Sequence, residues 1–447
     1  MMYLSIALRN LRQGGRRTWL LGIALALVAG LLVQLLSLSN GVHDSMVRAA
    51  TTLSAGHVNV SGFFKASPNS VSAPIVTKMS DVREFVARET SGVNFIIDRH
   101  RGWAKGVSDT SSMWVGLYGV EINSEKQLLN NLRAAQESDY IDGGGEARPG
   151  ELRRLSEPNS IALFAGQAKR LRVKLGDQIT LRTETLRGTS NTADLTVVAV
   201  IEDLGLLSSW NVLVPKQTIL DLYGLEADST GAIMLYLDNI EDAPTVRAEL
   251  GEKLEKAGYK VMDHDPRPFF MKFETVSGQN WSGQKLDLTT WDDEVSFMKW
   301  VLTAIDGVSL VLILVLAGII ALGIMNAMWI AVRERTREIG TLRAIGMSRS
   351  GVLKMFVFEA AALGAIGATA GAVLSAALSL LADKIGISVP INTVQAILMS
   401  EKLHFVVNPM DLIYTISGFT LFCSLSAIWP AIRAARMRPI TAIHTTE

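Results

Sequence analysis

Residues 305–332 read IDGVSLVLILVLAGIIALGIMNAMWIAV, an apolar run interrupted by a single charged side chain. A helix needs about 20 residues to cross the hydrocarbon core of a bilayer, so this run is long enough to form a membrane span. Three further apolar runs of sufficient length occupy residues 18–39, 352–382 and 410–432. The sequence therefore predicts an α-helical membrane protein with four transmembrane helices.

The first apolar run could instead be a cleaved signal peptide, because basic residues precede it. Its apolar core is longer than the roughly 7 to 15 residues of a signal peptide, and no small-x-small cleavage pattern follows Ser39. We therefore expect residues 18–39 to be retained as a membrane anchor.

A large insert, residues 40–298, separates the first two spans and has the mixed composition of a water-soluble domain. Strand-like and helix-like patterns alternate along it, which predicts a mixed α/β fold. The domain is expected to have two subdomains, and the run Gly143-Gly144-Gly145, followed by Pro149 and Gly150, indicates either an internal loop or a boundary. We expect strands at residues 57–61, 177–182, 195–202, 232–237 and 259–262, and helices at residues 161–173, 216–223 and 245–257.

The charge distribution predicts the orientation in the membrane. The insert holds 27 Lys and Arg residues against 35 Asp and Glu residues. Cytoplasmic loops carry an excess of Lys and Arg, so we expect residues 1–17, 333–350 and 433–447 in the cytoplasm. The insert and the loop 383–409 then lie outside the cytoplasm. The basic residues behind this prediction are Arg9, Arg12, Arg16, Arg17, Arg333, Arg335, Arg337, Arg343, Arg349, Lys354, Arg433, Arg436 and Arg438.

Composition excludes several classes of function. Basic and acidic residues number 43 each, and a zero net charge argues against nucleic-acid binding, which needs a basic surface. The single cysteine, Cys423, permits neither a disulfide nor a cysteine-based zinc site. No Gly-x-Ser-x-Gly elbow or His-Glu-x-x-His pair occurs, so we expect no catalytic site and no metal site. His264, between Asp263 and Asp265, could attract a cation, but a solvated loop is the commoner state of such a triplet.

The loop after the second span, residues 333–350, reads RERTREIGTLRAIGMSRS. Three of its apolar residues recur every three positions and predict one stripe on a short helix, which a glycine would end. Such a helix between two spans suits the docking of a soluble motor protein, although an ordinary basic loop that only sets topology fits equally well. The candidate coupling residues are Arg337, Glu338, Ile339, Leu342, Arg343, Ile345 and Gly346.

Small residues stand out in the first and third spans and let helices approach closely in lipid. We expect them to pack helices of one chain together, and a role in a dimer interface is the alternative. These residues are Gly22, Ala26, Gly30, Gly364, Gly367 and Gly371.

One acidic residue, Glu359, lies well inside a predicted span, where an ionisable group is costly and often functional. We expect it to pair with a basic residue of the loop, such as Arg343, and a proton relay is the less favoured alternative. Aromatic residues gather before the second span, either as an interfacial belt or as an apolar surface for an acyl chain or amphipathic substrate. They are Phe269, Phe270, Phe273, Trp281, Trp291, Phe297 and Trp300.

The segment RTREIGTLRAIGM at residues 335–347 resembles the signature of the FtsX-like permease domain in the MacB/LolC/LolE group of ABC transporters. LSIALRNLR at residues 4–12, SAGHVNV at residues 54–60 and LRVKLGDQITL at residues 171–181 are similar to other parts of that family. The order of one span, a large insert and three spans is similar as well. The resemblance therefore extends over nearly the whole chain.

The resemblance implies an ABC permease half whose periplasmic core domain moves when a partner ATPase changes its nucleotide state. The sequence holds no Gly-x-x-x-x-Gly-Lys-Ser/Thr phosphate loop, so we expect ATP and Mg²⁺ on a separate chain and no cofactor here. A separate ATPase departs from MacB and resembles the lipoprotein-releasing LolC/LolE branch, as does the Gly56-His57-Val58 stretch.

The expected function is therefore mechanical release of lipoprotein from the bacterial inner membrane by a non-enzymatic permease subunit. MacB-like export of a peptide, lipid or drug and FtsX-like signalling to a cell-wall hydrolase stay open as alternatives. The expected partners are a cytoplasmic ATPase, a second permease copy or paralogue, membrane lipids and a periplasmic lipoprotein carrier.

Overall fold

The computed structural model describes residues 9, 15–68, 70–185, 188–387, 389, 394–395, 398 and 402–437. Most of the predicted cytoplasmic segment 1–17, much of the tail 433–447 and part of the loop 383–409 lie outside these residues. The chain divides into two compact units. One holds most of the apolar helices and is called the helical unit below. The other holds residues 44–300 and 388–402, and its part 44–300 is called the α/β domain.

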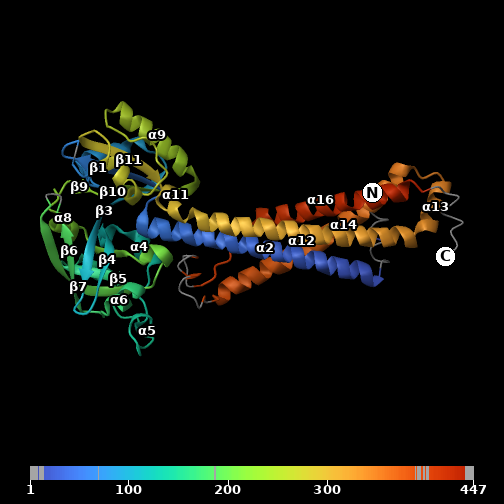
Figure 1. The fold of residues 1–447 in the computed structure, drawn as a ribbon, viewed down its shortest axis with the longest axis horizontal. Helices are drawn as coiled ribbons and strands as arrows, with labels where there is room; N and C mark the ends of the chain where they lie inside the picture. Colours follow the sequence, from blue (N-terminus) through green and yellow to red (C-terminus); the bar gives the residue numbers. More distant parts are fainter. Residues whose placement is uncertain are drawn as a thin grey trace. The chain divides into compact units, whose positions relative to one another are not determined.

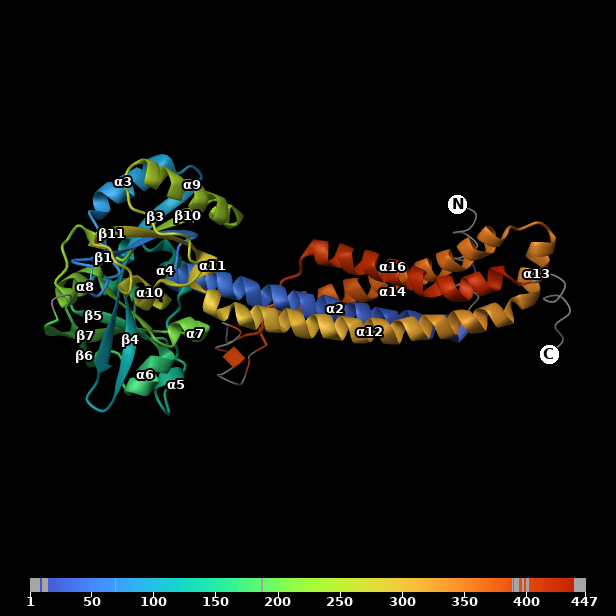
Figure 2. The same cartoon turned by 45° about the horizontal axis from the view of Figure 1, so that its top comes forward.

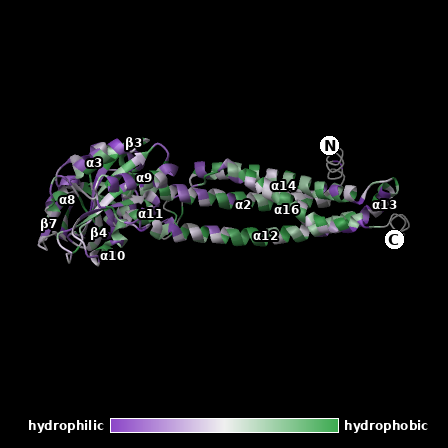
Figure 3. Cartoon of the chain, turned by 90° about the horizontal axis from the view of Figure 1, so that it is seen from above, coloured by the Kyte–Doolittle hydropathy of each residue, from purple (hydrophilic) through white to green (hydrophobic). Residues whose placement is uncertain are grey.

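The predicted fold class is confirmed. Within the described residues, four helices are long and apolar enough to cross a membrane, and the hydropathy colouring of Figure 3 marks them as mainly hydrophobic. The α/β sequence lies between the first and second of them. The four helices are α2 Gly15–Ala49, α12 Lys299–Glu334, α14 Arg349–Ile385 and α16 Pro409–Ala435.

The first helix continues ten residues beyond the predicted end of the span at Ser39 and reaches Ala49. Arg48 Nη2 and Asp44 Oδ2, one helical turn apart, form an ion pair at 2.7 Å that supports this polar extension. A five-residue π-helical turn, η1 (Ala50–Ser54), then ends the helix within the α/β domain. Hydropathy thus located the apolar part of the helix and not its true end.

The helical unit is held together by one apolar core. Helices α14 and α16 run side by side (Figures 1 and 2), and Ser348 caps α14 by accepting a hydrogen bond from the Gly351 amide at 3.1 Å. The short helix α13 (Thr336–Ala344) contributes Ile339 to this core. Its other buried members include Leu25, Ile324, Met328, Met355, Phe356, Ala360, Cys423, Ala427 and Ala431.

The α/β domain is built on one sheet with the strand order β11-β1-β10-β3-β4-β8-β5-β7-β6. Strand β6 also pairs with β3, so the last six strands close into a ring. The strands are β1 Val58–Lys65, β2 Val76–Thr77, β3 Val93–Val107, β4 Ser112–Val120, β5 Ser160–Phe164, β6 Gln178–Glu184, β7 Ser190–Ile201, β8 Asn211–Pro215, β9 Ser229–Thr230, β10 Ala232–Leu237 and β11 Gly283–Thr290.

Helices cover the sheet, and the described buried apolar residues include two large clusters and a smaller one around Ile97, Met234 and Tyr236. Helices α3 (Met79–Glu89) and α9 (Ala243–Lys256) cover one side of β1, β10 and β11 (Figure 2). Helices α6 (Ala165–Leu171) and α8 (Lys216–Tyr223) pack against the ring of strands. Shorter helical segments are η2 Ile122–Ser124, α4 Lys126–Asn131, α5 Glu137–Tyr140, η3 Leu152–Ser156, α7 Gly205–Ser208, η4 Ile240–Asp242, η5 Phe269–Met271, α10 Phe273–Ser277, α11 Trp291–Glu294 and η6 Ser296–Met298.

The two halves of the domain meet at β3. The first half of β3 pairs with β10, and its second half pairs with β4 from His100 onward. Tyr140, before the glycine run, and Leu163, after it, belong to the same core, so residues 143–150 form a loop within one half. The glycine run is thus an internal loop, one of the two expected alternatives, and the meeting of the halves within one strand has no local sequence signal.

Two other sequence predictions were wrong. Residues 161–173 were expected to form one helix, but Ser160–Phe164 form the fully buried strand β5 before α6 begins. Short apolar runs do not distinguish a buried strand from a helix. Residues 259–262 were expected to form a strand, but Val261 makes only an isolated bridge with Leu286.

Candidate functional site

The loop between the second and third long helices folds into α13. Helix α12 ends at Glu334, and the non-helical backbone of Arg335 separates it from α13. After α13, the amide of Met347 donates to the carbonyl oxygen of Leu342 at 3.0 Å. Gly346 has a φ of 111°, a conformation that favours glycine, so this residue fits the turn into α14.

The predicted apolar stripe does not face a single direction. Ile339 is 1% exposed and packs in the chain's own core, and Leu342 is half-buried against it. Ile345, in contrast, is 84% exposed. The stripe as a whole therefore cannot be a docking face, because two of its three members help to fix α13 to the helical unit.

The polar candidates on α13 divide in a similar way. Arg337 and Glu338 are exposed. Arg343 Nη1 donates to the carbonyl oxygen of Ala435 at 2.6 Å, at the end of α16. This bond connects α13 to the last of the four long helices, so a movement of α13 would also involve α16.

Glu359 pairs with Arg335 and not with Arg343, the partner named from the sequence. Arg335 Nη1 lies 3.3 Å from both carboxylate oxygens of Glu359, and the two side chains are 19% and 8% exposed. A salt bridge between Glu359 and a basic residue of this loop was expected. Which basic residue forms it depends on the non-helical break at Arg335. That break was invisible in the sequence.

Small residues of α2 and α14 bring these two helices into backbone contact. A Cβ atom at Gly371 would lie 2.0 Å from the carbonyl oxygen of Ala26, far inside normal contact distance. A Cβ at Gly30 would lie 3.2 Å from the carbonyl oxygen of Gly371, and one at Gly367 would lie 3.2 Å from that of Gly22. These five residues therefore pack two helices of the same chain.

The sixth small residue, Gly364, is in contact with a different helix. A Cβ atom there would lie 2.8 Å from both Cβ and Sγ of Cys423 on α16. The single cysteine of the chain is fully buried at this contact. Its accessibility therefore reports the packing of α14 on α16.

The C-terminal end of the first long helix is held inside the α/β domain by Arg99 of β3. Arg99 Nη1 donates to the carbonyl oxygens of Thr52 and Leu53 at 2.9 and 2.8 Å. Its Nε and Nη2 donate to the two oxygens of Glu125, each at 2.6 Å. The last carbonyl groups of a helix lack partners within the helix, and a buried cation satisfies them here.

Two further side chains complete this attachment. Arg101 Nη2 donates to the carbonyl oxygen of Ser54 at 2.9 Å. The Tyr236 hydroxyl donates to the carbonyl oxygen of Thr51 at 2.7 Å. Burial raises the pKa of Tyr236 to about 12, so this hydroxyl keeps its proton at neutral pH. We call Arg99, Arg101, Glu125 and Tyr236 the helix-end clamp.

Sequence reasoning did not identify the clamp. Arg99 and Arg101 occupy alternate positions of β3, so both point to the same face of the sheet. Arginine is almost never fully buried unless it is paired, and an alternating pair of arginines inside a long strand was the signal available. The acceptors, about 47 residues away along the chain, had no sequence signal.

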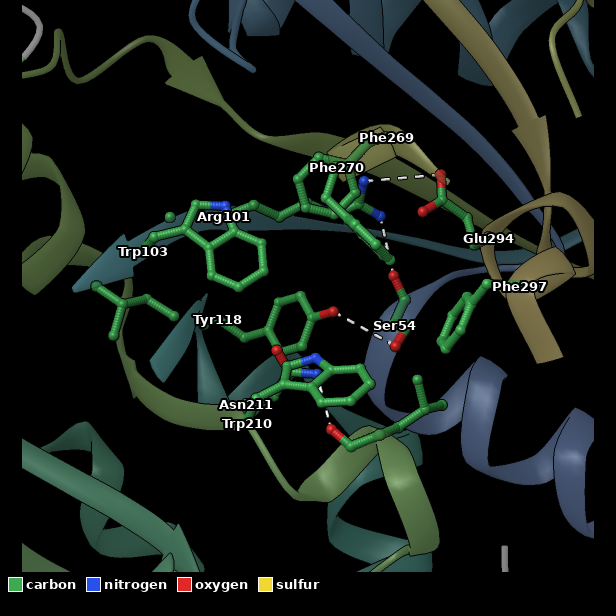
Figure 4. Close-up of a pocket in the computed structure, with 14 residues that line it drawn as sticks. Ser54, Arg101, Trp103, Tyr118, Trp210, Asn211, Phe269, Phe270, Glu294 and Phe297 are labelled. Atoms are coloured by element: carbon green, nitrogen blue, oxygen red, sulfur yellow. Dashed lines mark hydrogen bonds and ion pairs between the residues drawn. The ribbon is translucent and has the colours of Figure 1, made fainter. Parts of the chain in front are cut away.

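Three of the seven predicted aromatic residues, Phe269, Phe270 and Phe297, line a pocket in the α/β domain (Figure 4). The other four lie elsewhere. Phe273 packs edge-on against Phe63, and Trp281 lies beneath the Lys65 and Lys285 ammonium groups. Trp291 is half-buried at the start of α11, and Trp300 is 63% exposed near the start of α12.

The histidine proposed as a cation ligand has another partner. His264 Nε2 lies 3.1 Å from Asp293 Oδ2, an oxygen that also accepts from the Thr290 amide. Within the described part of the chain, no three His, Cys, Asp or Glu side chains are grouped to hold a metal ion.

Comparisons with known proteins connect this architecture to permeases. The model of the FtsX-like permease C-terminal domain matches residues 310–439. The macrolide export ATP-binding/permease protein MacB of Mannheimia succiniciproducens is 27% identical over 237 residues, which cover 53% of this chain and 31% of that protein. MacB of Nitrobacter winogradskyi is 34% identical over 152 residues, covering 34% of this chain and 20% of that protein. The chain thus matches less than a third of the length of these MacB relatives.

A third relative matches along its whole length. An uncharacterized ABC transporter permease of Methanocaldococcus jannaschii is 23% identical over 452 residues, covering 99% of this chain and 97% of that protein. Among solved structures, the periplasmic region of MacB from Actinobacillus actinomycetemcomitans has a TM-score of 0.30 at 12% identity, over 54% of this chain and 92% of that one. Residues 310–439 therefore match the FtsX-like permease C-terminal domain, in a chain that is similar to ABC transporter permeases of the MacB type.

Proposed function

We propose that this chain is the permease subunit of an ATP-driven transporter of the bacterial inner membrane. In this proposal ATP and Mg²⁺ bind to a partner ATPase in the cytoplasm. The excess of basic residues at one set of helix ends supports a cytoplasmic position for α13 and an extracytoplasmic position for the α/β domain. A second copy of the chain, or a paralogue, completes the permease.

The helix-end clamp is the observation that carries the proposal. A transporter that works by mechanical transmission needs a rigid connection from its membrane helices to its outer domain. Helix α2 continues into the α/β domain, where the turn η1 that follows it is held by buried donors on β3 and β10. Strand β3 in turn contributes to both halves of the domain. Movement of the helix would therefore reach both halves.

At the proposed cytoplasmic side, α13 is the element that receives the movement of the ATPase. Its inner face is fixed by Ile339 and by the bond from Arg343 to Ala435. Its outer face presents Ile345 together with Arg337 and Glu338. We propose that the ATPase contacts this outer face, with the exposed isoleucine as the apolar anchor.

For the cargo, we propose an amphipathic molecule that is extracted from the membrane. Lipoprotein, handed to a periplasmic carrier, is the first candidate because of the sequence resemblance to the releasing branch. Export of a peptide, lipid or drug is the second, and the names of the MacB relatives favour it. Signalling to a cell-wall hydrolase is the alternative outside transport.

The test is a pull-down of the tagged chain from membranes in mild detergent, followed by identification of the bound proteins. We expect an ATPase in the wild-type sample and a loss of about tenfold or more with Ile345→Asp, because a charge replaces the apolar anchor. Val71→Asp is the matched control, since Val71 is an 83% exposed apolar residue of the α/β domain. It should leave the recovery of the ATPase unchanged.

The bound species also discriminate between the candidate functions. Acylated lipoprotein in the sample would support release, and a cell-wall hydrolase without cargo would support signalling. Absence of any ATPase from the wild-type sample would contradict the transporter proposal as a whole. Equal recovery with Ile345→Asp would contradict only the proposed contact on α13.

A further inference from the structure

Three of the long helices enclose an apolar groove. Its walls come from α2, α12 and α16, and it encloses about 190 Å³. An apolar cavity of about 150 Å³ is large enough to bind benzene, so this groove has room for a stretch of hydrocarbon chain. Apart from the hydroxyl groups of Tyr414 and Thr415, its lining side chains are apolar. Tyr414 is 69% exposed and Gly418 is exposed as well, so the groove is open along α16 to the surroundings of the helices.

The groove lies in one half of the predicted spans. Its lining residues fall within residues 28–35 of α2, 313–317 of α12 and 414–422 of α16. In the orientation proposed above, this half of each span lies in the outer leaflet, where the helices are surrounded by lipid chains. The opening along α16 therefore admits a molecule from that leaflet.

On each helix the groove face continues outward to a polar residue that lies four or seven positions away. Positions four and seven apart share one side of a helix. The pairs of groove residue and polar residue are Leu35 and Ser39 in α2, Ile313 and Asp306 in α12, and Gly418 and Asp411 in α16. The groove is therefore hydrocarbon along its length and polar beyond its outer end.

Two carboxylates dominate this polar end. Ser39 Oγ donates to Asp306 Oδ1 at 3.1 Å, and Asn40 Nδ2 donates to Asp411 Oδ2 at 2.7 Å. Because Ser39 and Asn40 are successive residues, both carboxylates lie beside the same turn of α2. Among the described residues, no basic side chain forms an ion pair with either of them. A carboxylate accepts at several lone-pair sites, so both keep acceptor capacity for a positively charged donor.

We propose that this groove binds one lipid of the outer leaflet whose head group carries a primary ammonium. An acyl chain lies in the groove between Leu32, Ile313 and Phe422, and the ammonium donates to the carboxylates of Asp306 and Asp411. A lipid with a net negative head group is repelled by the same two carboxylates.

The inference rests on the proposed function only for the leaflet, which follows from the orientation of the spans. It adds to that function a ligand that contacts α2 and α12, the two helices that flank the α/β domain in the sequence. A bound lipid would therefore pack against both helices that lead into the outer domain.

The test is native mass spectrometry of the full chain in mild detergent, without any ATPase. The chain is incubated with phosphatidylethanolamine or with phosphatidylglycerol of identical acyl chains. We expect the bound fraction of the ethanolamine lipid to be about fivefold larger or more, which is the factor for one ion pair at a partly exposed site. Lipid that adheres elsewhere on the helices gives a background that the variants below determine.

Two variants separate the acyl chain from the head group. Gly418→Leu should reduce binding of both lipids to the background, because Gly418 lines the groove and an added Cβ has no described atom within 4 Å. Gly318→Leu is the matched control, since its added Cβ is equally free but the residue does not line the groove. Asp306→Asn/Asp411→Asn should bind the two lipids equally, and this variant tests the head group even if Gly418→Leu does not fold.

Equal binding of the two lipids by the wild-type chain would overturn the proposal, because the carboxylates would then contribute nothing. Equal lipid retention by Gly418→Leu and Gly318→Leu would overturn it as well. So would a wild-type dimer that Gly418→Leu converts to monomer without loss of lipid, since a second copy would then occupy the groove. The measurement needs no ATPase. Retained lipid with no ATPase in the pull-down would leave the lipid site in place and remove the transporter proposal.

Discussion

Breaking the helix-end clamp at Arg99 should unfold the region around the end of the first long helix. Arg99 and Glu125 are 0% and 1% exposed, and two hydrogen bonds of 2.6 Å join them. Arg99→Met leaves a buried carboxylate without its cation and two helix carbonyl groups without donors. Removing one partner of a buried ion pair costs about 3–5 kcal/mol, which corresponds to a factor of roughly 100 or more in the opening equilibrium.

A double variant separates the stability of the α/β domain from the attachment of the helix end. In Arg99→Met/Glu125→Met the uncompensated charge is gone, and replacing a buried pair by apolar residues is often close to neutral. We expect most of the lost stability to return, apart from about 1–3 kcal/mol for the unpaired carbonyl groups of Thr52 and Leu53. The helix end would then be in a folded domain but without its main attachment.

The assay is amide hydrogen exchange of the full chain in detergent, measured by mass spectrometry. Exchange of β3, β10 and η1 reports the free energy of local opening. Arg99→Met should accelerate exchange there by about 100-fold or more. Arg154→Met should have no measurable effect, because its pair with Glu157 is about half exposed at both side chains. Unchanged protection in Arg99→Met, or equal losses in the single and double variants, would refute the reasoning.

Two further predictions concern packing and pH. Gly364→Ala should destabilise the contact of α14 with α16 by about 1–3 kcal/mol through overpacking, because the added Cβ would lie 2.8 Å from Cys423. It should therefore lower the temperature at which Cys423 reacts with a maleimide. Gly318→Ala, whose added Cβ has no described atom within 4 Å, should not, and identical labelling temperatures would contradict the prediction. Burial, assisted by the charge of Lys216, lowers the pKa of His100 to about 4 from 6.5. Between these values the unfolded chain binds a proton that the folded domain does not, so stability should fall by about 3 kcal/mol as the pH drops from 6.5 to 4. The measurement is urea unfolding of the α/β domain across this pH range, monitored by hydrogen exchange. The free energy of unfolding should depend less steeply on pH in His100→Gln than in the wild type. An equal pH dependence would rule out His100 as the cause.

Long apolar runs and short strand-like or helix-like patterns are local properties of a sequence, and they predicted the four helices and the α/β character of the insert. The helix at residues 216–223 was also predicted correctly, because Pro215 precedes it and Gly224 follows it. Where a short apolar run was compatible with both a strand and a helix, the sequence prediction was wrong. Residues 160–164 form a strand because β7 and β8 lie on either side of them, which no local pattern encodes.

The candidate site depended much more on tertiary structure. Ile339, Leu342 and Ile345 have equal helical spacing, but only the packing of α13 determines which of them is exposed. Glu359 pairs with Arg335 rather than Arg343 because the helical backbone is interrupted at Arg335, between α12 and α13. The partner of a side chain depends on how segments far apart in the sequence pack together, and spacing along the sequence does not contain that information.

The sequence by itself determined the number of apolar helices, the large domain between the first two and the short helix that follows the second. These features follow from the hydrophobic effect and from backbone propensity, which act over neighbouring residues. Only the tertiary structure decided that two arginines of one strand hold the end of the first long helix. It also decided that residues as distant as Ser54, Arg101, Trp210 and Phe297 share one pocket, because burial of a charge is favourable only where the whole fold supplies its partners.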